Sequence, residues 1–416
     1  MSVTNRQLAV DAGLTMGWVT LLAGLCGSAY FARRVVVPKY GRREDLSIRS
    51  VYPGSDGQLF IELPATNHTK AAGRHSLWFA QGAGHACLGP VVETSEDRGS
   101  LTRVVERVDS GNLAQAAAGI WSGYVYSEPE QLGLPYRDVE ITVDDGVAPA
   151  WRFDSPPSDR AGTWAIHIHG MGGRRAGCLR GIPVARRLGL TSLVVSFRND
   201  GDAPPSCDKR YRLGETEWRD VEAAINYAVA EGAERIVIFG WSLGAALALR
   251  AAALSAHAPR IVGMVLDAPV FDWRTTLRAN AKAAGLPRPI VQLGFAILQS
   301  KALRWVTGLA EPICLDTLDW LARASELKKP ILILHGRKDD TTPFEASERA
   351  ATVRPDLVSL VEFESVGHSL EWNFDPDKWE HSVENWFHGL ALAGTSPEQA
   401  VASQEAFARS IGRPTR

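Results

Sequence analysis

The 416-residue chain has little cysteine, and its five cysteines are scattered without a C-x-x-C pair or metal-ligand spacing. An odd, dispersed set argues against a disulfide framework and indicates a reducing compartment or inert buried thiols. The chain also lacks a strong charge of either sign, because its formal net charge is −2. We therefore expect no nucleic-acid partner, since no overall basic field would attract one. Phosphate-loop signatures are absent from the sequence.

The composition that remains is that of an ordinary globular protein, with 45% hydrophobic and 22% charged residues. The length suits a full-sized catalytic domain with an additional segment. Arginine and alanine greatly outnumber lysine, which is typical of a GC-rich bacterial genome.

Residues 1–45 contain the longest uncharged run, from Leu14 to Phe31. Its length of about eighteen residues lies at the lower limit for a helix that spans a bilayer. More cations follow the run than precede it, which places the bulk of the protein on the cytoplasmic side. The cations after the run are Arg33, Arg34, Lys39, Arg42 and Arg43. The pattern predicts a single-pass membrane anchor with a basic linker and a cytoplasmic catalytic domain.

Two alternatives to the anchor remain open. Small residues at Gly27 and Ala29 fit a cleavable signal peptide, although the positive charge before the run is poor and arginines follow it directly. The segment also fits a buried helix of the soluble domain.

Residues 46–130 predict a small β-rich module of short strands and turns, at Leu46–Tyr52, Gln58–Leu63 and Ser76–Ala80. Gly82-x-Gly84 resembles the start of a dinucleotide fingerprint. No helical pattern or further glycine follows at the required spacing, so a glycine-rich hairpin is the better interpretation.

From Tyr136 the pattern changes to that of an α/β domain, expected over residues 136–392. A hairpin over Val139–Phe153 is followed by short apolar runs that alternate with helical stretches. Such runs suit strands that are buried on both faces, so we expect a mostly parallel sheet of eight strands. The runs are Thr163–His167, Ser192–Phe197, Arg235–Phe239, Ile261–Leu266, Ile331–Leu334 and Leu360–Phe363.

About sixty residues separate two of these runs, which is too many for a simple connection. This stretch, at about 268–329, contains apolar helical pieces and predicts an inserted helical cap. After the domain, residues 393–416 are polar and alanine-rich, and we expect a disordered tail.

Gly240-Trp-Ser-Leu-Gly244 follows a predicted buried strand and precedes a helix of small residues. A tight strand-to-helix turn of this kind presents the serine hydroxyl above the sheet, and the helix N-terminus supplies N–H groups for developing negative charge. The motif predicts that Ser242 is a nucleophile. The alternative is a glycine-rich turn with an inactive serine.

A serine nucleophile needs a base, and the base needs an acid. His368 lies in a loop directly after the last predicted strand, whereas His257 precedes any possible acid strand. His381 and His388 fall in a helical pattern, where packing or surface roles are ordinary. For the acid, Asp339, Asp340 and Asp267 all follow strands at the edge where α/β sheets carry their sites.

His167 and His169 alternate on one face of a strand. Such a pair can be half of a metal site. No third ligand follows at the spacing of metalloenzymes, so we expect no metal and no other cofactor.

His169-Gly170, Gly240-Trp-Ser-Leu-Gly244, His335-Gly-x-x-Asp339 and Gly367-His368 together resemble the α/β-hydrolase superfamily. The resemblance covers about residues 136–390 and implies a catalytic triad of Ser242, Asp339 and His368. It selects Asp339 because the family's aspartate stands three residues after the histidine-glycine pair. It also implies an oxyanion hole formed by the backbone N–H groups of Leu243 and Met171.

The expected function is that of a serine esterase that cleaves carboxylic esters, with an apolar acyl group favoured, through an acyl-enzyme on Ser242. The apolar cap and the predicted anchor favour a small-molecule or lipid-like substrate, with Phe295 and Leu293 as substrate-binding candidates. A peptidase resembling the prolyl oligopeptidase group is an alternative, although residues 46–130 are too few for a propeller. A thioesterase and a non-catalytic binding scaffold are further alternatives.

Overall fold

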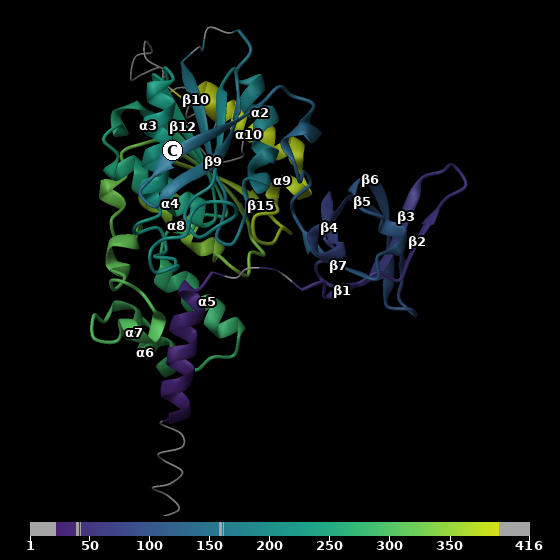
Figure 1. The fold of residues 1–416 in the computed structure, drawn as a ribbon, viewed down its shortest axis with the longest axis horizontal. Coiled ribbons are helices and arrows are strands. Elements are labelled where there is room, and N and C mark those ends of the chain that lie inside the picture. The colour runs from purple at the N-terminus through teal and green to yellow at the C-terminus, as the bar shows by residue number, and fades with distance from the viewer. Residues whose placement is uncertain (1–21, 39–40, 42, 158–159, 161, 391–416) are drawn as a thin grey trace, which may run out of the picture.

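The computed structural model describes residues 22–38, 41, 43–157, 160 and 162–390. Two sheets dominate it, and they lie side by side in Figure 1. We call the sheet over residues 46–122 the β module. Residues 137–390 form the α/β domain, and residues 268–329 within it are the cap.

The β module is a seven-stranded antiparallel sheet in the order β1-β7-β4-β5-β6-β3-β2. Its strands are β1 (Leu46–Ser47), β2 (Ser50–Pro53), β3 (Leu59–Pro64), β4 (His75–Phe79), β5 (Gly84–Ser95), β6 (Ser100–Ser110) and β7 (Ala118–Ser122). Gly82 lies in the turn between the antiparallel strands β4 and β5, and Gly84 is the first residue of β5. The glycine pair is therefore part of a hairpin, in agreement with the interpretation made from the sequence.

The α/β domain contains an eight-stranded sheet in the order β15-β14-β13-β12-β10-β11-β9-β8. The six strands from β10 to β15 pair in parallel, and β9 and β8 join antiparallel at one edge. The prediction of a mostly parallel sheet is confirmed. The strands are β8 (Arg137–Val143), β9 (Gly146–Phe153), β10 (Thr163–Ile168), β11 (Thr191–Val195), β12 (Arg235–Trp241), β13 (Ile261–Asp267), β14 (Ile331–Gly336) and β15 (Val358–Phe363).

Helices cover both faces of this sheet. One hydrophobic cluster joins it to α3, α4 and α8, and a second joins it to α2 and α10. These helices are α2 (Ile182–Arg187), α3 (Trp218–Ala230), α4 (Leu243–Leu254), α8 (Phe344–Val353) and α10 (Pro376–Gly389), and the short α9 (Glu371–Phe374) precedes α10. Helix α3 buries Val221 and Ile225 at helical spacing, which is why its sequence is amphipathic.

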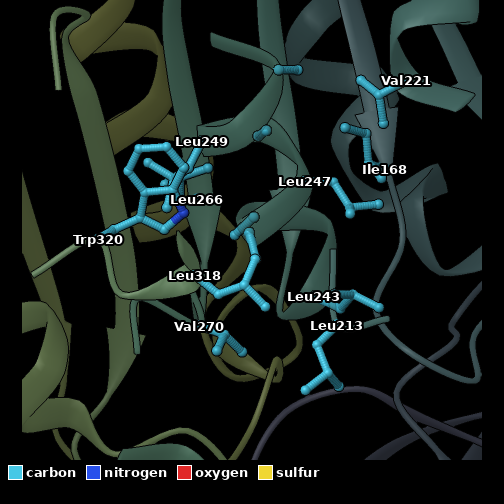
Figure 2. Close-up of a cluster of buried hydrophobic side chains, with 14 of the residues drawn as sticks. Ile168, Leu213, Val221, Leu243, Leu247, Leu249, Leu266, Val270, Leu318 and Trp320 are labelled. Atoms are coloured by element: carbon cyan, nitrogen blue, oxygen red, sulfur yellow. The ribbon is translucent and has the colours of Figure 1, made fainter. Parts of the chain in front are cut away.

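The cap lies between β13 and β14 and contains α5 (Trp273–Ala283), α6 (Arg288–Gln299) and α7 (Arg304–Thr307). The Asp272 side chain caps α5 by accepting hydrogen bonds from the backbone of Arg274 and Thr275. In Figure 2, the cap residues Leu318 and Trp320 lie with Leu249 and Leu266 of the α/β core. The cap therefore shares the main hydrophobic core and does not form a separate unit.

Residues 22–36 form a helix that packs on the cap; we call it the N-terminal helix (Figure 1). The Phe31 ring lies 6.1 Å from the Phe295 ring of α6. A side chain at Gly294 would have no room, because its Cβ would lie 2.4 Å from the Phe31 ring. Ala32 and Val36 are fully buried in the main core.

The predicted membrane run lies partly outside the described residues, because Leu14–Leu21 are not among them. Within the described part of the chain, no helix has both the length and the apolar character needed to cross a bilayer. The predicted tail, residues 393–416, falls outside the described residues.

Asn373 of α9 joins the β module to the α/β domain. Its backbone carbonyl accepts from the Arg74 N–H at 2.9 Å, and its side-chain amide donates to the carbonyls of Arg74 and Gly123. The Arg180 guanidinium donates to the Asn373 side-chain oxygen. Because Asn373 is fully buried, these hydrogen bonds fix the module against the domain.

We predict that Phe31→Ala destabilises the protein by about 3 kcal/mol, because the substitution opens a cavity against Phe295. The matched control is Tyr30→Ala at the preceding position, whose side chain is 61% exposed. We expect the control to change stability by less than about 0.5 kcal/mol. Denaturant unfolding of both variants checks this, and equal losses would show that the helix does not pack on the cap.

Candidate active site

Ser242 lies in a sharp turn between β12 and α4, and its backbone is in a conformation rare for a side-chain-bearing residue, with φ 53° and ψ −112°. Its N–H donates to the Asp267 carbonyl at 2.9 Å. The turn therefore holds a strained serine at the carboxyl end of the sheet.

The two glycines of the motif are required by close backbone approaches. A Cβ at Gly240 would lie 2.6 Å from the carbonyl oxygen of Gly244, and a Cβ at Gly244 would lie 2.2 Å from the Ile168 carbonyl oxygen. Both distances are shorter than any real contact of a Cβ atom. Only glycine therefore allows β12, α4 and the end of β10 to meet at Ser242.

The structure brings the three predicted site residues together. The His368 Nε2 atom lies 2.9 Å from the Ser242 Oγ atom, and its Nδ1 atom lies 2.7 Å from the Asp339 Oδ2 atom. The imidazole is partly exposed and the Asp339 carboxylate is fully buried. Serine, imidazole and carboxylate thus form one hydrogen-bonded chain.

The Asp339 carboxylate is held by further donors. Its Oδ1 atom accepts from the backbone of Thr341 and Thr342 at 2.8 Å each, and its Oδ2 atom accepts from the Thr342 hydroxyl at 2.7 Å. Burial alone would raise the pKa of Asp339, but the charge on His368 and hydrogen bonds from His335 and His368 lower it well below its usual range. The carboxylate is therefore ionised at neutral pH.

The other candidate acids and bases lie outside the hydrogen-bonded chain of Ser242, His368 and Asp339. The Asp340 side chain is exposed and accepts from the Thr341 hydroxyl. His335 is buried behind Asp339, where its Nε2 atom lies 3.1 Å from the carboxylate. His381 and His388 lie on the exposed side of α10.

Asp267 does not reach His368 but forms a buried site with Glu371, a residue that the sequence did not indicate. Its Oδ2 atom accepts from the Trp379 indole at 2.8 Å, and Glu371 accepts from the Gly336 N–H at 2.8 Å. Burial and the neighbouring Asp267 raise the pKa of Glu371 well above its usual range. By accepting the hydrogen bond from Gly336, Glu371 supports the loop that carries Asp339.

The predicted oxyanion hole lies where the loop after β10 meets the nucleophile. A Cβ at Gly170 would lie 3.2 Å from the Ser242 Cβ atom, so this loop is in contact with the serine. The N–H groups of Gly172, Gly173 and Arg174 all donate to protein acceptors.

The N–H groups of the two predicted donors, Met171 and Leu243, differ because they have no acceptor among the described residues. Among the described residues, no acceptor takes the N–H of Met171, and none takes that of Leu243 at the first position of α4. Both donors are thus free for another acceptor beside Ser242.

A sequence model of the alpha/beta hydrolase family matches residues 165–380. The chain belongs to the alpha/beta hydrolase family. A second model, described as a domain of unknown function (DUF8805), matches residues 47–122, which corresponds to the β module. No curated protein sequence matches the chain.

Solved structures of hydrolases resemble this hydrolase in part. An esterase from Pyrococcus furiosus is 23% identical, with 63% of this chain and 93% of that chain covered and a TM-score of 0.48. An esterase from Rhodococcus sp. is 20% identical, with coverages of 61% and 99% and a TM-score of 0.43. A serine hydrolase without a lid from Xanthomonas campestris is 17% identical, with coverages of 63% and 97% and a TM-score of 0.40.

Two side chains that the sequence did not indicate hold the loop after β10, which carries the predicted donor Met171. The Asp200 carboxylate accepts from the Gly172 N–H at 2.8 Å and from the Tyr211 hydroxyl. On the other side, the Tyr124 hydroxyl accepts from the Arg174 N–H at 3.1 Å. Burial raises the pKa of Asp200 to about 7. The loop is thus fixed between the domain's own Asp200 and a tyrosine just after the last strand of the β module.

His167 and His169 are packing residues. The His167 ring stacks on Phe239 at 4.6 Å and the His169 ring on Phe197 at 4.4 Å. Burial lowers the pKa of His167 to about 3 and that of His169 to about 4, so both are neutral.

The two predicted substrate-binding residues lie in α6 of the cap. Phe295 is buried between Phe31 and the Arg278 guanidinium. Leu293 is half-buried against the main core. Contact with a substrate stays a prediction for both, and Phe295 has a clear packing role.

We predict that Tyr124→Phe lowers kcat about tenfold while KM and the thermal midpoint stay nearly unchanged, because the loop loses one of its two outer supports. Tyr126→Phe is the matched control, since its hydroxyl has no hydrogen-bond partner among the described residues. Steady-state kinetics on a soluble ester check whether kcat falls while KM stays the same. A raised KM with kcat unchanged would contradict a positioning role for Tyr124.

Proposed function

We propose that this hydrolase cleaves carboxylic esters through an acyl-enzyme on Ser242. The observation that carries the proposal is the position of His368, whose ring is within 2.9 Å of the Ser242 hydroxyl and 2.7 Å of the Asp339 carboxylate. The free N–H groups of Met171 and Leu243 beside Ser242 add donors for the carbonyl oxygen of the ester.

In the first half of the reaction, His368 Nε2 accepts the Ser242 proton as the oxygen attacks the ester carbonyl carbon. The carbonyl π electrons move to oxygen, and the N–H groups of Leu243 and Met171 stabilise that charge. The intermediate collapses by breaking the bond to the alcohol oxygen, which takes the proton from His368. A water molecule, deprotonated by His368, then attacks the acyl carbon. The second intermediate breaks its bond to Ser242 Oγ, which takes the proton from His368, so that the acid and free Ser242 are released.

Asp339 keeps the histidine in the tautomer that this sequence requires. Its ionised carboxylate accepts from Nδ1, so Nε2 is free to accept the serine proton. It also stabilises the imidazolium that forms during attack. The low pKa of Asp339 means that it holds this role without taking the proton.

Ester hydrolysis is preferred over the peptidase alternative because residues 46–122 fold as one seven-stranded sheet rather than as propeller blades. An apolar acyl group is the preferred part of the substrate, because Leu293 of the cap is apolar and only partly buried. We further propose that Leu14–Phe31 contributes to membrane attachment, with the α/β domain in the cytoplasm and the substrate lipid-like. The uncharged run and the cations that follow it support this location.

With p-nitrophenyl esters of increasing acyl length, we expect kcat/KM to rise several-fold per two carbons until the acyl site is full. The reason is that each buried methylene contributes about 0.8 kcal/mol. Leu293→Ala should flatten this rise and leave acetyl-ester hydrolysis intact, and Ser242→Ala provides the blank. Rates independent of chain length, together with cleavage of a peptide amide, would favour the peptidase.

Asp339→Asn should lower kcat by about 10⁴, because the amide holds the histidine in the wrong tautomer. Asp340→Asn is the control, because the neighbouring carboxyl is exposed and does not contact His368. Its kcat should stay close to that of the unmodified enzyme. The same kinetic assay compares the two variants, and similar losses in both would refute the assignment of the acid.

A further inference from the structure

The cap carries an unusual concentration of positive charge. Between Asp272 and Glu311 the sequence has no acidic residue, although the whole chain has a net charge of −2. Six cations lie in this stretch, at Arg274, Arg278, Lys282, Arg288, Lys301 and Arg304. A local excess of this size raises the concentration of anionic partners near the cap even when the whole protein is nearly neutral.

Most of these cations have no acidic partner within the structure. Arg274 and Arg304 pair with Asp316 and Glu311. The other four, Arg278, Lys282, Arg288 and Lys301, form no ion pair with any described residue and are exposed. Their charges are available to an external anion.

Three of the unpaired cations line one pocket. Arg278 and Lys282 of α5 and Arg288 of α6 surround a pocket of about 400 Å³, which Leu286 and Val291 complete with apolar surface. The Arg278 guanidinium also lies 5.5 Å over the Phe295 ring, which fixes its position. The pocket thus combines cations with an apolar wall, the chemistry that suits the anionic headgroup of an amphiphile.

The N-terminal helix, which packs on α6 of the cap, carries exposed apolar side chains. It lies beside α6 and α7 at one end of the α/β domain (Figure 1). Its outer side exposes Leu22, Leu25 and Tyr30, and the neighbouring α7 exposes Trp305 at 75%. Tyrosine and tryptophan next to unpaired cations are typical of a surface that lies at a membrane interface.

We infer that the cap and the N-terminal helix together form a docking surface for an anionic membrane. The pocket between α5 and α6 receives a lipid phosphate, and Trp305 with the outer leucines of the helix enters the interfacial layer. The exposed aliphatic side chains of Leu22 and Leu25 near these cations favour a lipid surface as the anionic partner. The inference does not depend on ester hydrolysis or on the insertion of residues 14–21.

The test uses the full chain and sedimentation with vesicles of phosphatidylcholine, with or without an equal part of phosphatidylglycerol. The Arg278→Gln, Lys282→Gln, Arg288→Gln triple variant should bind the anionic vesicles at least about tenfold more weakly, because three charges no longer face the lipid. The same loss should appear for the unmodified protein in high salt, since the exposed charges are screened. Trp305→Ser should also weaken binding.

A matched control removes three exposed cations outside the cap and the N-terminal helix, with Lys70→Gln, Arg137→Gln and Arg349→Gln. It has the same change in net charge and should bind anionic vesicles like the unmodified protein. Equal losses in both triple variants would overturn the inference. Binding that is the same with and without phosphatidylglycerol, or tighter binding to RNA than to vesicles, would overturn it as well. Hydrolysis of a soluble acetyl ester, measured in parallel, shows whether each variant is folded and separates this outcome from failure of the esterase proposal.

Discussion

The backbone of Ser242, with its positive φ, is the constraint around which the active site is arranged. This backbone conformation depends on the close approach of α4 to β10, where Gly244 lies against the carbonyl oxygen of Ile168. Ile168 is the residue before His169, at the start of the loop after β10. One close contact therefore sets both the position of the nucleophile and the origin of the loop that faces it. A shift of α4 would move both halves of the site together.

The active site is supported from outside the α/β domain as well. Tyr124 contacts the loop after β10, and Gly123 packs so tightly on Leu370, two residues after His368, that a Cβ would lie 2.7 Å from it. The chain that leaves the β module thus touches loops on both sides of Ser242. The β module, whose sheet lies beside the α/β sheet in Figure 1, thus contributes to the geometry of the candidate site.

The sequence was sufficient for the features that local patterns encode. Buried strands appeared as β-branched runs, and the turn at Ser242 appeared as two glycines between a strand and a helix of small residues. The position of His368 was indicated by its place after the last strand of the sheet, and Asp339 was selected over Asp340 by a family spacing. In the structure Asp339 contacts His368, whereas the Asp340 side chain is exposed.

Other parts of the site have no local signal. Glu371, Asp200 and Tyr124 act through contacts with residues far away in sequence, as in the Tyr124–Arg174 hydrogen bond, which spans 50 positions. The strands β5 to β7 were also missed; β5, for example, begins with six buried residues in succession and ends mostly exposed, so it lacks the alternation that marks a strand. Such features depend on burial and partners that only the folded chain defines.

The contact between the N-terminal helix and the cap also has a consequence for biosynthesis. Arg33 and its partner Val306 are 273 positions apart. At ~5–20 residues per second, a ribosome needs roughly 14 to 55 seconds to make the intervening chain. During that interval the apolar side of the helix, with Phe31 and Val36, has emerged without the cap that later buries it. The order of synthesis therefore leaves this segment without its partner in the fold until the cap has been made.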